Sequence, residues 1–432
     1  MQKRIIALLL LFVALLFSSC DDFSYIVSTK TRDTINTNKS NSIKIDKNNS
    51  AQEIKAPEYF KQVTLNAGYK TLDTEDMKRV YSAIGAHLND FTDKPSSSYK
   101  GSYESGSFTV ENCSITKRQL AKVFFAFSLD HPEVFWLSEP YSFSIYDNKI
   151  SLTLYFSVKE ETQKKRLGQL NAVINSILKG LKKEMTPFER ELYIHDYIVK
   201  NCKYDKKADE SKNRDPYTIY GCLVNQKAVC MGYSYAFQYL LSFAGIKSLT
   251  IDGDDDDTGH MWNAVKLDGN WYYTDVTWDD INDISMYDYF NITTEQLEKT
   301  HVIVPKMNAY NDDELFMSDG TIKSCNLIIP KCDSLDCNYY VYKGSVLESL
   351  SDNTLGEDLA RVAENGEEYF HIYVNNSDFD YIYSALFSDE SYAFADFIKE
   401  ANDLLGERVL STNVVVTSKK DLNVISVQLN YN

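Results

Sequence analysis

The stretch that decides the fold is GHMWNAVKLDGNWYYTDVTW, residues 259–278. Two runs rich in aromatic and β-branched residues flank Asp268-Gly269, a dipeptide typical of a two-residue hairpin turn. The pattern therefore predicts two antiparallel strands, one on each side of this turn. Counting outward from the turn places Asp275 opposite Trp262, so that His260 and Asp275 are diagonal neighbours on one face, within side-chain reach. A register slip of one residue would separate them onto opposite faces.

Cys230 lies upstream, at the start of a predicted helix. The helix ends before Gly245, and its apolar residues recur at helical spacing at Ala236, Phe237, Leu240, Leu241 and Ala244. At a helix start, unpaired N–H groups and the positive end of the helix dipole stabilise a thiolate. A buried and inert cysteine is the commoner interpretation of a single core cysteine. The predicted pair of His260 and Asp275 favours a reactive one.

Cysteine, histidine and aspartate in this arrangement suit nucleophilic catalysis. A thiol attacks only after deprotonation, and an imidazole can take its proton and later protonate the leaving group. A carboxylate on the other ring nitrogen fixes the imidazole tautomer and stabilises the imidazolium. The hairpin supplies the histidine and the carboxylate, so only the approach of Cys230 to His260 must come from the fold.

The order of these three residues and the phrases around them resemble the transglutaminase-like superfamily. The matching phrases are AVCMGY at 228–233, GHMWN at 259–263 and YTDVTWD at 273–279. The resemblance spans residues 160–300. It implies a papain-like α+β fold, in which a cysteine-bearing helix packs on an antiparallel sheet, with Cys230, His260 and Asp275 as a catalytic triad. The superfamily includes protein cross-linkers, peptidases, amidases and members without activity.

Four further residues are candidates for supporting roles. An acyl-transfer site needs a donor to the oxyanion besides the backbone N–H of Cys230, and Tyr220 and Gln226 are the nearby candidates. Trp262 and Trp278 flank the triad, where they either line a substrate cleft or pack the sheet.

The acidic run DGDDDD at 252–257 predicts a solvated loop beside the cleft. It lacks the spaced ligands and final glutamate of a calcium loop, and we expect neither a metal nor another cofactor. We hypothesise that its charge raises the pKa of His260 and favours cationic substrates such as lysine-bearing peptides. His195, which shares a helix face with apolar residues, is expected to be a buried, hydrogen-bonded structural residue.

The first twenty residues predict a targeting segment. A short positive start precedes an apolar stretch over 5–17 that is too short to span a bilayer. Small residues then precede Cys20, an arrangement that resembles a bacterial lipobox, although Phe17 stands where leucine is usual. The resemblance implies lipidation of Cys20 and an extracytoplasmic, membrane-anchored location; the alternative is a plain secretory signal. Polar residues without apolar periodicity predict a flexible linker over 21–56.

The remaining chain predicts three α+β domains. They are an N-terminal domain at 57–160, the transglutaminase-like catalytic domain at 161–310 and a C-terminal domain at 311–432. Periodicity predicts helices at 76–88, 116–129, 163–183, 187–200 and 379–405, and strands at 141–146, 149–158, 369–374, 412–416 and 423–429.

Composition limits the choice of function. The net charge of −17 argues against nucleic acid as a partner. Of the eight cysteines, six remain after Cys20 and Cys230, an even number that permits disulfides without defining their pairing. The leading prediction is a cell-surface, cysteine-dependent acyl-transfer enzyme whose substrate is a protein or peptide amide. The alternative is a non-catalytic lipoprotein that binds peptides or the cell wall on the same fold.

Overall fold

The structure is a computed structural model. It describes residues 53–431 except for 211, 256–257, 282–283, 286, 304–328, 352–353, 376–378, 389–391 and 407–408. The predicted signal peptide with Cys20, nearly all of the predicted linker and the predicted boundary at residue 310 lie outside the described residues. The chain forms two compact units, one made of 1–266, 275–284 and 301–330 in their described parts, the other of 267–274, 285–300 and 331–432.

The N-terminal elements form a sheet with two helices. The helices are α2 (Glu75–Ala86) and α3 (Lys117–Asp130), with the 3-10 turn η1 (Tyr69–Thr71), and the strands are β1 (Phe91–Pro95), β2 (Tyr103–Ser105), β3 (Phe108–Val110), β4 (Leu137–Tyr146) and β5 (Lys149–Phe156). The strand order is β1-β2-β5-β3, and β4 also pairs with β5. As predicted, the β4–β5 hairpin turns at Asp147 and Asn148, both at positive φ, the conformation that a two-residue turn requires.

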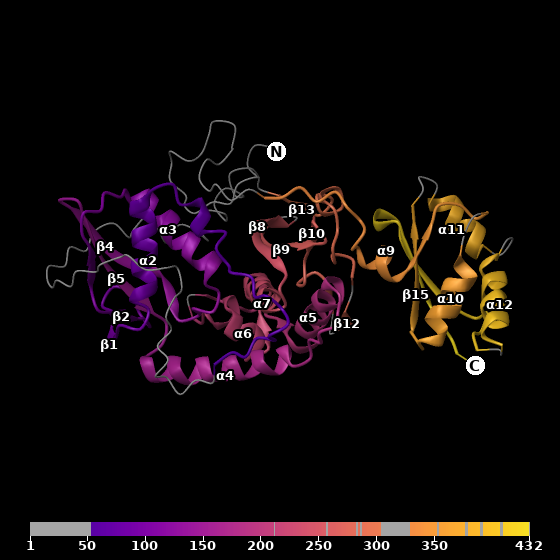
Figure 1. The fold of residues 1–432 in the computed structure, drawn as a ribbon, viewed down its shortest axis with the longest axis horizontal. Coiled ribbons are helices and arrows are strands. Elements are labelled where there is room, and N and C mark those ends of the chain that lie inside the picture. The colour runs from indigo at the N-terminus through magenta and orange to yellow at the C-terminus, as the bar shows by residue number, and fades with distance from the viewer. Residues whose placement is uncertain are drawn as a thin grey trace, which may run out of the picture. The chain divides into compact units, whose positions relative to one another are not determined.

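Four helices follow in the same unit (Figure 1). They are α4 (Glu160–Leu178), α5 (Pro187–Asn201), α6 (Ile219–Leu223) and α7 (Cys230–Phe243), with η2 (Asp215–Tyr217) and the parallel pair β6 (Lys203–Tyr204) and β7 (Lys227–Ala228) between them. A capping box at Thr186 and Glu189 starts α5 at Pro187, where the predicted helix 187–200 begins. Helix α7 is apolar nearly all round and largely buried, which suits a central helix.

A four-stranded sheet carries the rest of the core. Its order is β10-β9-β8-β13, with β8 (Lys247–Asp255), β9 (Thr258–Leu267), β10 (Asn270–Thr274) and β13 (His301–Val302). The predicted turn is present, with φ of 46° at Asp268 and 95° at Gly269. The return strand ends at Thr274, before the predicted residue 278. The reason is local, because the Asp275 side chain accepts the backbone N–H groups of Thr277 and Trp278 and so forms a turn.

In its described part, residues 252–255, the acidic run is not the loop that the sequence predicts. Strand β8 continues through Asp255, because β9 pairs with it on one side and β13 on the other. The register places Gly253 opposite His260 and Asp255 opposite His301. Paired backbone on both sides keeps this segment extended despite its charge, and two of its carboxylates are thereby placed next to the site described below.

The C-terminal elements build a second sheet with helices. The strands are β14 (Ser345–Leu347), β15 (Tyr369–Val374), β16 (Val415–Lys419) and β17 (Val424–Gln428), in the order β14-β15-β17-β16, and the helices are α8 (Thr294–Leu297), α9 (Tyr339–Lys343), α10 (Leu355–Glu364), α11 (Phe379–Phe387) and α12 (Phe394–Leu405). The single helix predicted at 379–405 is two helices, since the polar stretch after Phe387 favours turns. Short elements complete the chain: β11 (Asp280–Ile281), β12 (Ile284–Ser285) and η3 (Lys420–Leu422).

Candidate active site

Cys230 is the first residue of α7. Val229 before it is extended, with φ −99° and ψ 177°, and the helix begins at the cysteine. Cys230 is half-buried, whereas the other five cysteines in the described part of the chain are buried, and all six are free thiols. The predicted position at a helix start is therefore confirmed, and Cys230 is the most accessible of these thiols.

Close packing holds this end of the helix in place. A Cβ atom added to Gly232 would lie 2.6 Å from the carbonyl oxygen of Pro216 and 2.8 Å from the Cβ of Ala228. Such distances are shorter than van der Waals contact, so glycine is required where the helix passes the backbone of η2. The close approach fixes the position of Cys230, two residues earlier.

Two hydrogen bonds dock α7 onto β9. The Ser234 hydroxyl donates to the carbonyl of Met261 at 2.8 Å, and the Asn263 amide donates to the carbonyl of Ser234 at 3.1 Å. Both contacts are buried. This docking brings the start of α7 to β9, and Cys230 there is close enough to His260 to help raise the pKa of that imidazole, the step that the sequence could not supply.

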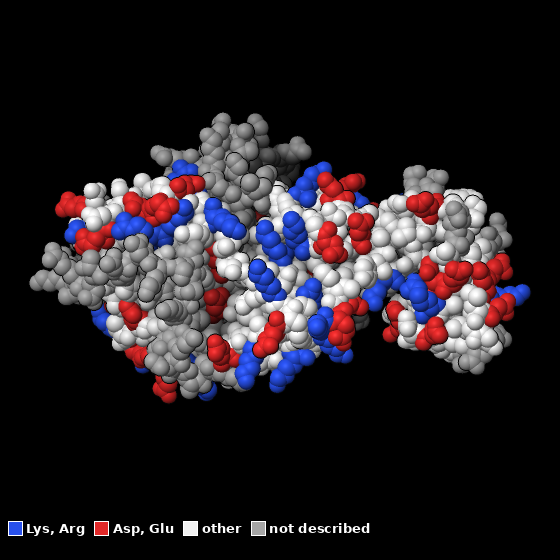
Figure 2. All heavy atoms as spheres, in the orientation of Figure 1, with Lys and Arg blue, Asp and Glu red and all other residues white. Residues whose placement is uncertain are grey.

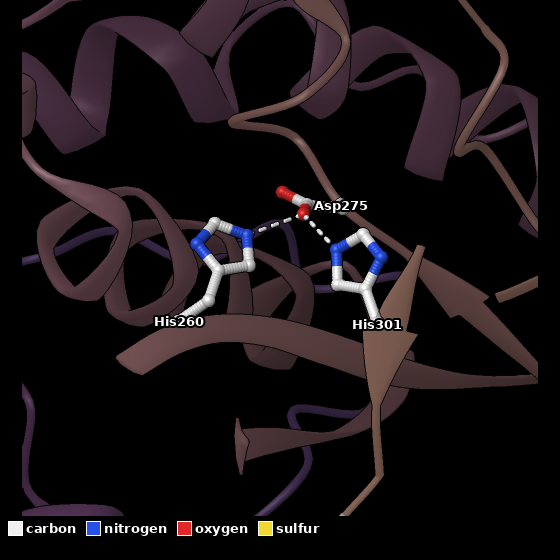
Figure 3. A group of neighbouring side chains, drawn as sticks. All are labelled: His260, Asp275 and His301. Atoms are coloured by element: carbon white, nitrogen blue, oxygen red, sulfur yellow. Dashed lines mark hydrogen bonds and ion pairs between the residues drawn. The ribbon is translucent and has the colours of Figure 1, made fainter. Parts of the chain in front are cut away.

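His260 also meets Asp275, as the hairpin register predicts. The Nε2 atom of His260 lies 2.6 Å from Oδ2 of Asp275 (Figure 3). The other carboxylate oxygen, Oδ1, accepts the backbone N–H groups of Thr277 at 2.9 Å and Trp278 at 3.2 Å. His260 is 4% exposed and Asp275 is 1% exposed, so this pair is shielded from solvent and fixed in orientation.

The electrostatics of the pair follow from its surroundings. Burial lowers the pKa of His260, but the charge and hydrogen bond of Asp275, aided by Cys230, outweigh it and raise that pKa to about 11. Burial raises the pKa of Asp275, but His260 and His301 outweigh it and hold that pKa well below its usual range. At neutral pH the arrangement therefore favours an imidazolium beside a carboxylate.

His301 is a site residue that sequence reasoning missed. Its Nε2 lies 3.1 Å from the same Oδ2 atom of Asp275 that His260 contacts, and the two imidazoles flank the carboxylate in Figure 3. It comes from β13, a strand too short to be recognised by alternation. Neither spacing nor composition marks this histidine, because the pairing of β13 with β8 is what brings it to the site.

The same three residues have the donor atoms of a metal site. One atom from each of His260, Asp275 and His301 lies within 4.8 Å of the others. Each of these atoms also takes part in a hydrogen bond of the cluster. Hydrogen bonding alone therefore accounts for the geometry, and the chemistry below uses the three residues as donors and acceptors.

Asp255 and Trp278 lie on the other side of His260. Oδ2 of Asp255 is 3.5 Å from Nδ1 of His260 and accepts the indole N–H of Trp278 at 3.3 Å. Trp278 is half-buried, as a residue at the edge of a cleft would be. Of the acidic run, Asp255 is the residue in contact with His260, while the increase in the pKa of His260 comes chiefly from Asp275 and Cys230. Burial and Asp254 raise the pKa of Asp252 to about 6.

The remaining predicted residues have surroundings that differ from the expected roles. Trp262 has no exposed surface, so it packs the core and does not line a cleft. The Tyr220 hydroxyl donates to Gln169 on α4 at 2.8 Å, which directs it to another part of the unit and argues against an oxyanion role. Gln226 is exposed, and its carbonyl accepts from the backbone of Lys203.

Tyr204 is a second residue that the sequence did not indicate. It lies on β6, whose partner strand β7 ends two residues before Cys230. Burial, together with the charges of Cys230, Asp255 and Asp275, raises the pKa of Tyr204 to about 12. The side chain is still 41% exposed. A tyrosine that stays protonated and is partly exposed near the thiol is suited to contact a substrate.

His195 has the structural role that the sequence predicts. It is wholly buried, and its Nε2 lies 3.1 Å from Oδ2 of Asp279. Asp279 belongs to the turn after Asp275, and its backbone N–H donates to the carbonyl of Asp275 at 3.1 Å. This second histidine–aspartate pair ties α5 to the segment that carries Asp275.

Comparison with known proteins identifies the domain. Residues 175–276 match the transglutaminase-like superfamily, and this segment contains Cys230, His260 and Asp275. The chain therefore carries a transglutaminase-like domain with a mixed α+β fold, as the motifs predict. The superfamily includes cysteine-dependent enzymes as well as members without activity.

Particular relatives match over short segments. The kyphoscoliosis peptidase of Mus musculus is 29% identical over 121 residues, which cover 25% of this chain and 18% of that protein. The kyphoscoliosis peptidase of Homo sapiens is 31% identical over 110 residues, covering 23% of this chain and 17% of that protein. The chain thus spans less than a fifth of the length of these relatives. A crystal structure of a TGase is similar to this chain, with 14% sequence identity and a TM-score of 0.24. The match covers 40% of this chain and 50% of the chain in that crystal structure.

The charge of the surface and the character of the helices can be described for the same residues. On the face drawn in Figure 2, basic and acidic side chains are interspersed over the described residues. No described helix has both the length and the apolar character needed to cross a membrane.

Proposed function

We propose that this chain is a cysteine-dependent acyl-transfer enzyme that acts on protein or peptide amides. Cys230 is the nucleophile, His260 the proton donor and acceptor, and Asp275 the residue that orients His260. The observation that carries the proposal is the His260–Asp275 pair together with a half-buried cysteine at the start of α7. Asp275 lies 2.6 Å from Nε2 of His260, which leaves Nδ1 to act on Cys230, whose side chain helps to raise the pKa of His260.

This geometry supports a two-step reaction. The Cys230 sulfur attacks the amide carbonyl carbon, and the backbone N–H of Cys230 stabilises the oxyanion. The imidazolium of His260 then protonates the leaving amine as the carbon–nitrogen bond breaks, which leaves a thioester on Cys230. Water or a second amine attacks the thioester, and His260 takes the proton of that nucleophile. Hydrolysis is the favoured outcome, since water is always available.

The groups around the cysteine favour a cationic peptide as substrate. Asp255 and the exposed Asp254 lie at the end of β8 nearest His260, and the partly exposed Tyr204 is close enough for the charge of Cys230 to raise its pKa. A lysine or arginine side chain near the scissile amide would find these carboxylates. The name peptidase of the two relatives agrees with an amide in a protein as the bond attacked.

The motif around Cys20 supports a site of action at the bacterial cell surface, with a lipid anchor on that cysteine. Intact-mass measurement of the chain from a bacterial membrane fraction tests the anchor. A diacylglycerol mass on the peptide that begins at Cys20 is expected, and an unmodified Cys20 in the secreted chain contradicts it.

The enzyme and the binding-protein alternative differ in the reactivity of Cys230. If the thiol is activated, iodoacetamide at pH 7 will alkylate Cys230 faster than the other cysteines. Peptide mass spectrometry measures the alkylation of each cysteine. His260→Ala should slow the alkylation of Cys230 and leave the other cysteines unchanged. Slow alkylation of Cys230 in the wild type, equal to that in the variant, contradicts the proposed enzyme and favours a binding protein.

A further inference from the structure

His301 occupies a position that packing alone does not explain. The side chain is 2% exposed and lies against two tryptophans, with ring centroids 5.1 Å from Trp262 and 4.7 Å from Trp278. An apolar residue would fill this space without the cost of burying an imidazole. Burial of a polar ring is offset when it finds a strong hydrogen-bond partner, and the carboxylate of Asp275 at 3.1 Å is such a partner.

The contact completes the hydrogen bonding of Asp275. Oδ1 of this carboxylate accepts two backbone N–H groups, and Oδ2 faces the Nε2 atoms of both His260 and His301. Figure 3 shows the two rings on either side of the carboxylate. A carboxylate with donors on both oxygens cannot rotate without breaking at least one bond, so it presents Oδ2 to His260 in one orientation.

The β13–β8 pairing gives His301 its place. His301 is the direct partner of Asp255 in this antiparallel pair, and Asp255 contacts the opposite ring nitrogen of His260. A single strand pair therefore places one residue on each side of the His260–Asp275 unit. The ring of His260 itself is 5.3 Å from the ring of His301.

We propose that His301 is a positioning residue for the reaction: its Nε2–H holds the Asp275 carboxylate in the orientation that His260 needs. The inference rests on the proposed function, because it assigns His301 a role in activating Cys230 through Asp275 and His260. His301 itself does not touch the reacting atoms.

Three substitutions separate the hydrogen bond from the packing. His301→Gln keeps an N–H donor near the place of Nε2. His301→Phe keeps a ring against Trp262 and Trp278 without a donor, and His301→Leu is closer to histidine in volume and also lacks a donor. The rate of Cys230 alkylation by iodoacetamide at pH 7 is measured for each variant, and circular dichroism checks the fold.

We expect H301F and H301L to react about tenfold more slowly than the wild type and H301Q to stay within about threefold of it, as for other residues that orient a catalytic group. Equal rates in the wild type and H301F overturn the inference. A loss of alkylation rate in H301Q as large as that in H301F also overturns it. Loss of folding in both apolar variants while H301Q folds overturns it as well, since the role of His301 would then be structural.

The same measurements distinguish this inference from the proposed function. A wild-type Cys230 that reacts no faster than the other cysteines contradicts the enzyme itself. A wild-type Cys230 that reacts selectively, with H301F matching it, contradicts the role of His301 alone.

Discussion

His260 has acidic or nucleophilic partners at both ring nitrogens, and this explains most of its properties. Asp275 at 2.6 Å, aided by Cys230, raises the pKa of His260 and favours the protonated ring, although His260 is only 4% exposed. The direction of this effect is clear: a negative charge next to a buried imidazole favours the imidazolium. The sequence already indicated the Asp275 contact, because a hairpin register is a local property.

Removing the charge of Asp275 should lower the pKa of His260. In Asp275→Asn the largest group that raises this pKa is lost, while burial continues to lower it. NMR titration of the imidazole C–H signals, assigned with His260→Gln, measures the change. In the wild type we expect His260 to stay protonated through pH 9, and in the variant to lose its proton at lower pH. The same midpoint in both proteins, or a higher one in the variant, contradicts the assignment.

Helix α7 and strand β9 carry the site between them. The sequence indicates each element separately, since helical periodicity after Cys230 and alternation around His260 are local patterns. Their docking depends on Ser234, Asn263 and the close approach at Gly232, which involve residues distant in the chain and follow no periodic pattern. This is why the approach of Cys230 to His260 came from the resemblance to a family and not from spacing.

Gly232→Ala should displace the start of α7. The added Cβ would meet the Pro216 carbonyl at 2.6 Å, and overpacking of this kind costs about 1–3 kcal/mol. We expect a lower melting temperature and slower alkylation of Cys230. Gly259→Ala is the matched control, because Gly259 adjoins His260 yet a Cβ there has no atom within 4 Å. Equal alkylation rates in the two variants contradict the role of the close approach.

Across the described chain, local features were predicted well and long-range pairings were not. Helices α2, α3 and α5 and strand β15 lie close to their predicted ranges, because capping boxes and periodicity mark them. Residues 252–255 of the acidic run were wrongly predicted as a loop, since pairing with β9 and with the distant β13 keeps them extended. His301 was missed for the same reason, and Trp262 proved to be a core residue.

The transglutaminase-like domain lies between other α+β elements, and the reacting residues all belong to one compact unit. Cys230, His260, Asp275 and His301 fall within the first unit. The first unit therefore holds all four site residues, while the turn at Asp268 and Gly269 and the strand β10 that lead to Asp275 belong to the second.

The most direct test of this account is turnover of protein substrate by the wild type and by Cys230→Ala, purified side by side. Each is incubated with a mixture of lysine-rich peptides, and mass spectrometry follows new amino termini, hydrolysed amides and new amide cross-links. With the wild type, the account predicts at least one of these products and a thioester adduct on Cys230. With the variant, it predicts no such product and no adduct. Products formed equally by both proteins, or a reactive Cys230 that yields no product from any amide, would contradict it.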